Sequence, residues 1–201
     1  MNHSPRAIVH DALNRAWRAW CAFAYLGVAQ RTMLELIVPA RFKDSLMSVL
    51  TSVVAAVFYI YYYDFVRQNV WYSIVLFSWV VVTLIYHAIA VYLKRQEQAK
   101  VVLSDVQLQN YMGITVLISI WQSVVVSLIA IEALRHGANG LNSPAVIGAV
   151  FFFVGLSMVV FVCATSVWLT NVILILPLMV YFLVHAQAGE RLIAGFLLLL
   201  M

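Results

Sequence analysis

Charged residues are scarce in this chain of 201 residues, and their scarcity indicates the class of protein. Asp, Glu, Lys and Arg make up only 10% of the sequence, whereas hydrophobic residues make up 65%. A soluble domain carries about 25% charged residues, so the surplus apolar surface must face lipid. No polar stretch is long enough to fold separately, and the chain is therefore predicted to form a single membrane domain.

The chain also lacks the motifs of the common enzyme classes. It has no HExxH sequence for zinc, no glycine-rich loop for phosphates and no nucleophile beside a base. Every Asp and Glu lies near the end of an apolar run or in a loop, whereas ion pumps place carboxylates at membrane depth. The sequence thus disfavours both an enzyme and an ion-coupled transporter, without deciding whether the chain has enzymatic activity.

Cysteine and histidine indicate neither a metal site nor a cofactor. The two cysteines, Cys21 and Cys163, lie far apart in apolar contexts and are predicted to be packing residues. His87 and His185 fall near opposite ends of their helices, about 20 Å or more apart, which is too far for one haem. His136 shares the outer face with His185, and both are predicted to be ordinary interfacial side chains.

The longest apolar run extends from Asn69 to Leu93 and stops at Lys94 and Arg95. A helix of about 20 residues, rising about 1.5 Å per residue, crosses a hydrocarbon core of about 30 Å. This run is therefore predicted to be a transmembrane helix, with the basic pair on the cytoplasmic side.

The remaining apolar runs predict an all-α polytopic membrane helix bundle of about six transmembrane helices. The last run is too short to cross a bilayer, so we expect it to be half-inserted or to continue beyond Met201. The other predicted spans are Leu46–Phe65, Met112–Leu134, Ala145–Ala164, Val167–Val184 and the short run Leu192–Met201.

The polar segments are predicted to lie on the cytoplasmic surface. Residues 1–13 resemble a loose tail, and Asn14–Val38 suits an amphipathic helix in the membrane interface that ends at Pro39. A re-entrant hairpin is the alternative. Residues 94–110 are long enough for a second, short interfacial helix. The chain thus divides into residues 1–45, the tail and interfacial helix, and 46–201, the bundle.

The distribution of basic residues predicts the orientation. With a cytoplasmic N-terminus, nine of the twelve Lys and Arg residues lie inside, which agrees with the positive-inside rule for a bacterial inner membrane. Because the basic residues flank apolar runs, the net charge of +4 does not indicate nucleic acid. The three that lie outside are Arg67, Arg135 and Arg191.

Two helices carry polar interruptions near mid-membrane. Gln122, beside Trp121, lies on a helix whose small polar stripe consists of Ser119, Ser123 and Ser127. Gln122 needs a hydrogen-bond partner there, and Asn171 or Thr170 is the expected one. Such stripes usually serve close helix packing. The alternative hypothesis is a ligand-binding site.

Pro177 interrupts the helix that also carries Asn171, because proline frees a carbonyl about four residues earlier. A static kink is the common outcome, and a hinge or pocket lining is the functional alternative. Combined with the hypothesis for the neighbouring stripe, this gives a candidate ligand site lined by Trp121, Gln122, Asn171 and Pro177.

The order of these features resembles the N-terminal multi-span sensor modules of bacterial histidine kinases and diguanylate cyclases. The likeness covers residues 30–201 and rests on Gln30-Arg31, Pro39, the central Trp121 and the closing LPLMVYFLVHAQAGERLIAGFLLLL with Gly189. It implies a signal-input module, expected to be a homodimer, that binds a small apolar or amphiphilic ligand. Any kinase or cyclase activity would lie in a following cytoplasmic domain. The alternative is a non-enzymatic membrane subunit or small-solute transporter complete in itself.

Overall fold

The computed structural model describes residues 5–25, 31–99, 104–136, 148–149 and 164–185. These residues form helices and short connections with no strand among them, which confirms the predicted all-helical fold. The helices are α1 (Pro5–Tyr25), α2 (Arg31–Tyr62), α3 (Asp64–Gln68), α4 (Val70–Gln98), α5 (Asp105–Arg135) and α7 (Ala164–His185).

Four of these helices are long and apolar enough to cross a membrane, which indicates a membrane protein. They contain Ser45–Tyr62 in α2, Val70–Gln96 in α4, Asp105–Arg135 in α5 and Trp168–His185 in α7. Each corresponds to a predicted span. The other two predicted spans, Ala145–Ala164 and Leu192–Met201, lie almost entirely outside the described residues.

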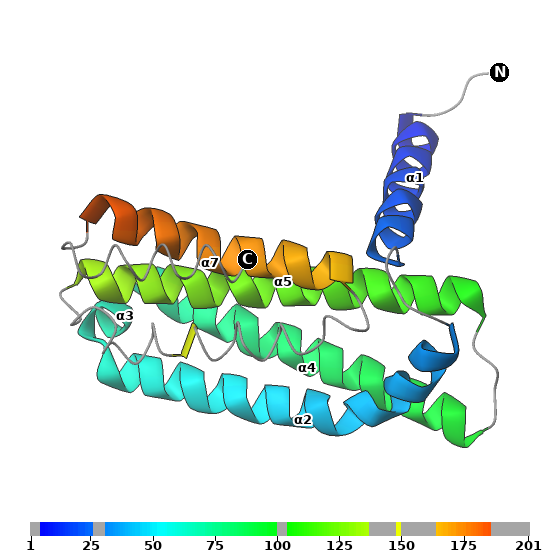
Figure 1. Ribbon diagram of the computed structural model, residues 1–201, viewed down its shortest axis with the longest axis horizontal. Coiled ribbons are helices and arrows are strands. Elements are labelled where there is room, and N and C mark those ends of the chain that lie inside the picture. Colours follow the sequence, from blue (N-terminus) through cyan, green and yellow to red (C-terminus); the bar gives the residue numbers. More distant parts are fainter. Residues whose placement is uncertain (1–4, 26–30, 100–103, 137–147, 150–163, 186–201) are drawn as a thin grey trace.

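The four long helices lie side by side (Figure 1). Successive helices α2 and α4 run in opposite directions and are joined through α3, whereas α5 and α7 run in the same direction. We call the end where α2, α5 and α7 finish the α3 end. The opposite end, where α4 finishes and α5 begins, is the α1 end because α1 joins the bundle near it.

Helix α5 is the most buried of the four. Its side chains Val125, Ile129 and Ala130 are inaccessible and pack in a core with residues of α4 and α7 such as Leu76 and Leu174. In contrast, α2 and α4 keep broad exposed apolar faces, as lipid-facing helices do.

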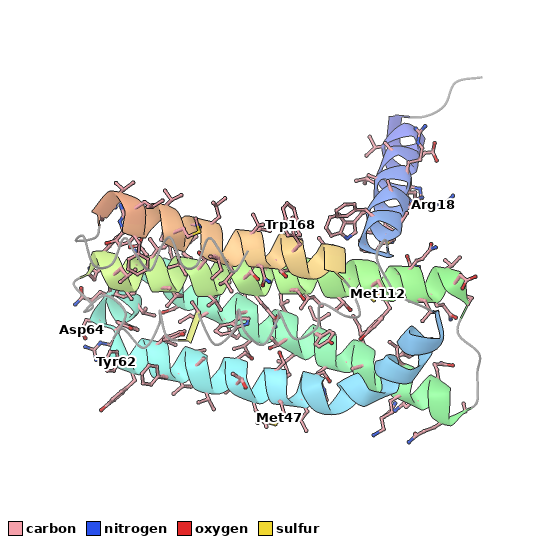
Figure 2. The ribbon with its side chains drawn as sticks, viewed as in Figure 1. Arg18, Met47, Tyr62, Asp64, Met112 and Trp168 are labelled. Atoms are coloured by element: carbon pink, nitrogen blue, oxygen red, sulfur yellow. The ribbon has the colours of Figure 1, made fainter. Side chains whose placement is uncertain are left out.

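Side chains on the outer surface of the bundle include large exposed apolar groups. Met47 of α2 and Trp168 of α7 point away from the bundle (Figure 2), and each is 60% exposed. In a bilayer, where lipid tails solvate such groups, close packing and interhelical hydrogen bonds, rather than apolar burial, hold helices together.

The N-terminal prediction is wrong in its boundaries. α1 begins at Pro5, within the predicted loose tail, because proline is well suited to the first turn of a helix, where its missing N–H costs nothing. A second helix, α2, begins at Arg31 and continues through Pro39 instead of ending there. A proline inside a helix can bend it without ending it, and the first turns of α2 bend away from the rest (Figure 1).

The short interfacial helix predicted within residues 94–110 is also wrong. α4 continues to Gln98, and α5 begins at Asp105. Ser104 caps α5: its Oγ accepts a hydrogen bond from the Gln107 backbone N–H at 3.3 Å, and Gln107 Oε1 accepts one from the Ser104 N–H at 2.9 Å. This capping box satisfies two backbone donors at the helix start. Over its 31 residues, α5 is about 46 Å long and therefore exceeds the hydrocarbon core.

Candidate functional site

Hydrogen bonds between side chains join α2, α4 and α5 at mid-length. Gln122 Nε2 of α5 donates to Ser48 Oγ of α2 at 3.4 Å, and Trp121 Nε1 donates to Ser78 Oγ of α4 at 3.2 Å. We call this set of contacts the polar layer; its further pairs are Ser52–Thr83 at 2.8 Å and Ser45–His87 at 3.0 Å.

The partner of Gln122 differs from the expected one. The sequence favoured Asn171 or Thr170 on α7, whereas the amide nitrogen of Gln122 donates to Ser48 on α2. The serine is not conspicuous in the sequence because it lies near the beginning of its span, and only the packing of α2 places it at this depth.

The predicted ligand-site residues lie on two helices that pack against each other, α5 and α7. Gln122 and Asn171 are both buried, whereas Trp121 is 37% exposed at the edge of α5. Arg135 of α5 lies near Tyr181 of α7, so the corresponding ends of the two helices lie close together. Asn171 precedes Tyr181 by ten residues and Gln122 precedes Arg135 by thirteen, so the two amides differ in depth by about three residues, or about 5 Å.

Pro177 lies inside α7 without ending it. Nearby, Ile175 and Leu178 are buried, whereas its immediate neighbour Leu176 is 44% exposed. Because proline has no N–H, the carbonyl of Ile173 loses its usual helical donor. α7 thus has a weak point in its hydrogen-bond ladder while it remains packed.

The three serines of the stripe on α5 differ in their hydrogen bonding. Ser119 Oγ donates to the Thr115 carbonyl of its own helix at 3.0 Å. Ser123 and Ser127 are buried, but within the described part of the chain their hydroxyls have no hydrogen-bond partner. An unsatisfied buried hydroxyl costs about 1–3 kcal/mol, so these two groups would benefit from a polar group placed beside them.

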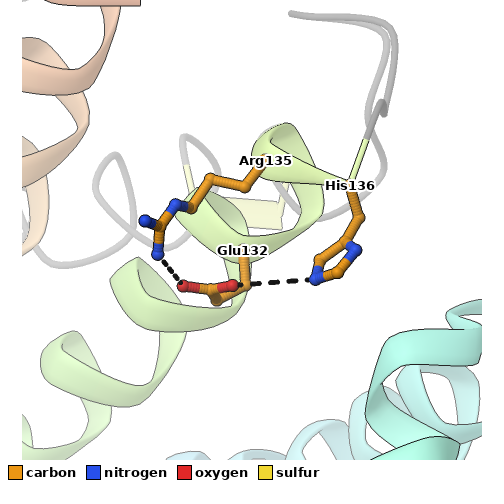
Figure 3. Close-up of polar contacts among 3 residues, drawn as sticks. All are labelled: Glu132, Arg135 and His136. Carbon is orange, nitrogen blue, oxygen red and sulfur yellow. Dashed lines mark hydrogen bonds and ion pairs between the residues drawn. The ribbon is translucent and has the colours of Figure 1, made fainter.

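A second polar cluster closes the α3 end around Glu132 (Figure 3). Its carboxylate is only 13% exposed and accepts a hydrogen bond from Arg135 Nη1 at 2.8 Å, while His136 Nε2 lies 3.9 Å away. Tyr72 of α4 also hydrogen-bonds to it. The His136 ring stacks on Phe65 of α3, with 4.8 Å between ring centroids. This Glu132 cluster therefore joins α3 and α4 to the end of α5.

The two histidines predicted to share this face have separate ring partners. His185 stacks on Tyr181 within α7 at 4.8 Å, whereas His136 stacks on Phe65. Among the described residues, no three His, Cys, Asp or Glu side chains come together as metal ligands would.

A third set of contacts, which we call the α1–α5 joint, was not predicted. Trp17 Nε1 donates to Asn110 Oδ1 and Trp20 Nε1 to the Gly113 carbonyl, each at 3.0 Å. Cys21 Sγ also donates to Asn110 Oδ1, at 3.6 Å. Burial raises the pKa of the Cys21 thiol above its ordinary value, which keeps the thiol protonated.

Gly113 allows the two helices of the joint to approach closely. A Cβ atom at this position would lie 2.6 Å from Cys21 Sγ and 3.5 Å from Cys21 Cα, so a side chain here would force the Cys21 thiol, or α1 with it, to move. The sequence signal was a glycine at the start of an apolar run, together with Trp17, Trp20 and Cys21 at helical spacing.

No protein-family model, curated protein or solved structure matches this chain. Any function must therefore be argued from the residues and their geometry.

Proposed function

We propose that the chain is the membrane-embedded input module of a bacterial signalling protein and binds a small apolar or amphiphilic ligand between its helices. The observation that carries the proposal is the central position of α5. This helix packs on α7, reaches α2 and α4 through Gln122 and Trp121, and holds α1 near its beginning. A displacement along α5 would therefore be transmitted to helices at both ends of the bundle.

The proposed location is the bacterial inner membrane, with the N-terminus in the cytoplasm and about six crossings. Lys94 and Arg95 end α4 at the α1 end, whereas Arg67 and Arg135 lie at the α3 end, which supports a cytoplasmic α1 end. α5 and α7 run in the same direction, as an intervening crossing at Ala145–Ala164 requires.

The proposed ligand site is lined by Trp121 and Gln122 of α5 and by Asn171 and Pro177 of α7. The close packing of the two helices and the small difference in depth between their amides support a shared site. Ser123, whose buried hydroxyl has no partner among the described residues, would offer a hydrogen bond to a neutral headgroup. Sites for such ligands are mostly apolar with a few placed polar groups.

In the proposed mechanism, ligand entry shifts α7 relative to α5. The proline in α7 makes that helix easier to deform than its neighbour, because Pro177 leaves one backbone carbonyl without its helical donor. The shift would pass to the following chain and to a cytoplasmic output domain, within a homodimer whose partner copy undergoes the same change.

Photolabelling tests this proposal in the full chain reconstituted in nanodiscs. Dodecanol carrying a diazirine should label peptides of α5 and α7 near Gln122 and Asn171 in a saturable manner, and unlabelled dodecanol should compete. Lipid-facing residues such as Phe77 of α4 provide the internal control, since labelling there should rise linearly with probe concentration. Gln122→Leu should remove the saturable part only. If labelling rises linearly with probe concentration at every position, the chain has no ligand site of this kind and the proposal is wrong.

A further inference from the structure

α1 has two chemically different faces. At about 100° per residue, Val9, Leu13 and Phe23 lie on one side of the helix, and they are 59%, 64% and 40% exposed. The opposite side carries the polar residues His10, Asp11, Asn14, Arg15 and Arg18. A helix with this pattern is typical of the boundary between lipid headgroups and acyl chains.

The depth at which α1 joins the bundle agrees with this boundary. The joint lies at Gly113 of α5, and 22 residues separate Gly113 from the helix end at Arg135 (135 − 113 = 22). At about 1.5 Å per residue this is about 33 Å, close to the hydrocarbon thickness of about 30 Å. When the α3 end of α5 lies at one membrane surface, α1 therefore lies at the other.

The direction of α1 fits the same position. The four long helices share one direction, whereas α1 leaves the bundle sideways at its joint with α5 (Figure 1). Helices that cross a membrane run roughly along its normal, so α1 extends along the surface. Trp17 and Trp20 lie at this level, where indole rings are enriched in membrane proteins.

From these observations we infer that α1 binds the lipid bilayer at the α1 end of the bundle, with Val9, Leu13 and Phe23 inserted among the acyl chains. Arg15 lies toward the border between the two faces, where its guanidinium can reach lipid phosphates. Its ion pair with Asp11 spans 3.4 Å between largely exposed side chains, so it is weak enough to exchange for a phosphate. The joint to α5 keeps the inserted helix attached to the bundle.

Site-directed spin labelling tests the inference in the full chain. The chain is placed in nanodiscs of equal parts phosphatidylcholine and phosphatidylglycerol, in a background of Cys21→Ser and Cys163→Ser. Serine at position 21 retains a donor for Asn110. Nitroxides are attached one at a time at Val9→Cys and Leu13→Cys, with Asp11→Cys and Arg18→Cys as matched controls from the opposite face. Collision rates are then measured with oxygen, which concentrates in lipid, and with a water-soluble nickel complex.

We expect the ratio of oxygen to nickel collisions to exceed one at positions 9 and 13 and to fall below one at positions 11 and 18. Nickel collisions dominating at all four positions would place α1 in water and overturn the inference. Labels at 9 and 13 shielded from both reagents would mean that protein, such as a second copy of the chain, covers the apolar face, which also overturns it.

A second measurement leaves both cysteines unchanged, in case the serine background disturbs the joint. Benzoylphenylalanine is incorporated at Leu13 or, as the control, at Arg18, and the chain is irradiated in the same nanodiscs. Mass spectrometry should find lipid attached at position 13, with a yield several-fold higher than at position 18. Equal lipid yields at both positions, or attachment at 13 to protein alone, would contradict the inference.

Discussion

The two ends of α5 are held to their neighbours by different kinds of contact. Near the α1 end, the contacts are made by uncharged, closely packed groups. Two indoles and a thiol donate hydrogen bonds to Asn110 and Gly113, and a Cβ atom at Gly113 would collide with Cys21 Sγ. At the α3 end, the Glu132 carboxylate gathers Arg135, His136 and Tyr72, and two of these partners are largely exposed.

Because of this difference, we expect the stability of the α1 end to depend on side-chain volume and that of the α3 end to depend on salt. A joint of packed neutral groups depends on shape, because interiors tolerate added volume poorly. A cluster of charged groups at a surface depends on ionic strength, because salt screens exposed charges. Four predictions test the contrast, ordered from the largest expected effect to the smallest.

Gly113→Val should have the largest effect. The new side chain collides with Cys21 and should separate α1 from α5, at a cost of about 1–3 kcal/mol as in other overpacked sites. The measurement is the reaction of Cys21 with a maleimide in a Cys163→Ser background. Cys21 should become several-fold more reactive. Leu117→Val, at an exposed position of the same helix, is the control and should leave the rate unchanged.

Asn110→Ala should weaken the same joint without adding volume. It removes the acceptor for both Trp17 and Cys21, and leaving a part-buried donor unpaired costs about 1–3 kcal/mol. We expect a lower thermal midpoint and faster alkylation of Cys21. Asn110→Asp keeps the acceptor oxygen and should restore most of the loss. If alanine and aspartate behave alike, the hydrogen bonds do not hold the joint.

Glu132→Gln should have a smaller effect that depends on salt. The amide keeps an acceptor for Tyr72 but removes the charge that Arg135 and His136 face, so the loss should be about 0.5–1 kcal/mol at low salt. Thermal unfolding at low and high salt should show that the difference from the native chain shrinks as salt rises. Asp64→Asn breaks an exposed pair with Arg67 and should change little.

The smallest effect concerns pH at the α1–α5 joint. Because burial raises the pKa of Cys21, fewer thiolates exist at a given pH than for an exposed cysteine, and alkylation near pH 8 should be slow. The neutral thiol favours docking below the ordinary thiol pKa, and this stabilisation should decline as pH rises through the raised pKa. Cys21→Ser should lose the pH dependence of docking. A native chain whose docking does not change up to pH 10 would contradict this linkage.

Much of the fold follows from the sequence because span length and hydropathy are local properties. The runs beginning at Leu46, Asn69, Met112 and Val167 each correspond to a described helix that is long and apolar enough to cross a membrane. The beginning of α5 is also encoded locally, in the capping pair Ser104 and Gln107, which lies outside the apolar run that begins at Met112. Pro39 alone does not fix a helix end, because a proline can bend a helix as well as end it.

The contacts between helices could not be predicted in the same way. Trp17 and Asn110 are 93 residues apart, and Gln122 and Ser48 are 74 apart, so their pairing depends on how whole helices pack. The candidate ligand site could be predicted only in part, because its residues are local features but their proximity depends on helix packing. Its residues were selected as local interruptions of apolar helices, and the structure adds that α5 and α7 pack together. Occupation by a ligand stays a prediction.

In the proposed mechanism, α5 connects the proposed ligand site at mid-membrane to the α1–α5 joint, and one distance measurement tests this connection. Spin labels at Leu13→Cys of α1 and Val106→Cys of α5, both exposed, are placed in the Cys21→Ser and Cys163→Ser background in nanodiscs. Electron–electron double resonance records their distance distribution with and without dodecanol. We expect a shift in this distance that saturates with dodecanol and disappears in Gln122→Leu. An identical distribution at every dodecanol concentration would contradict it.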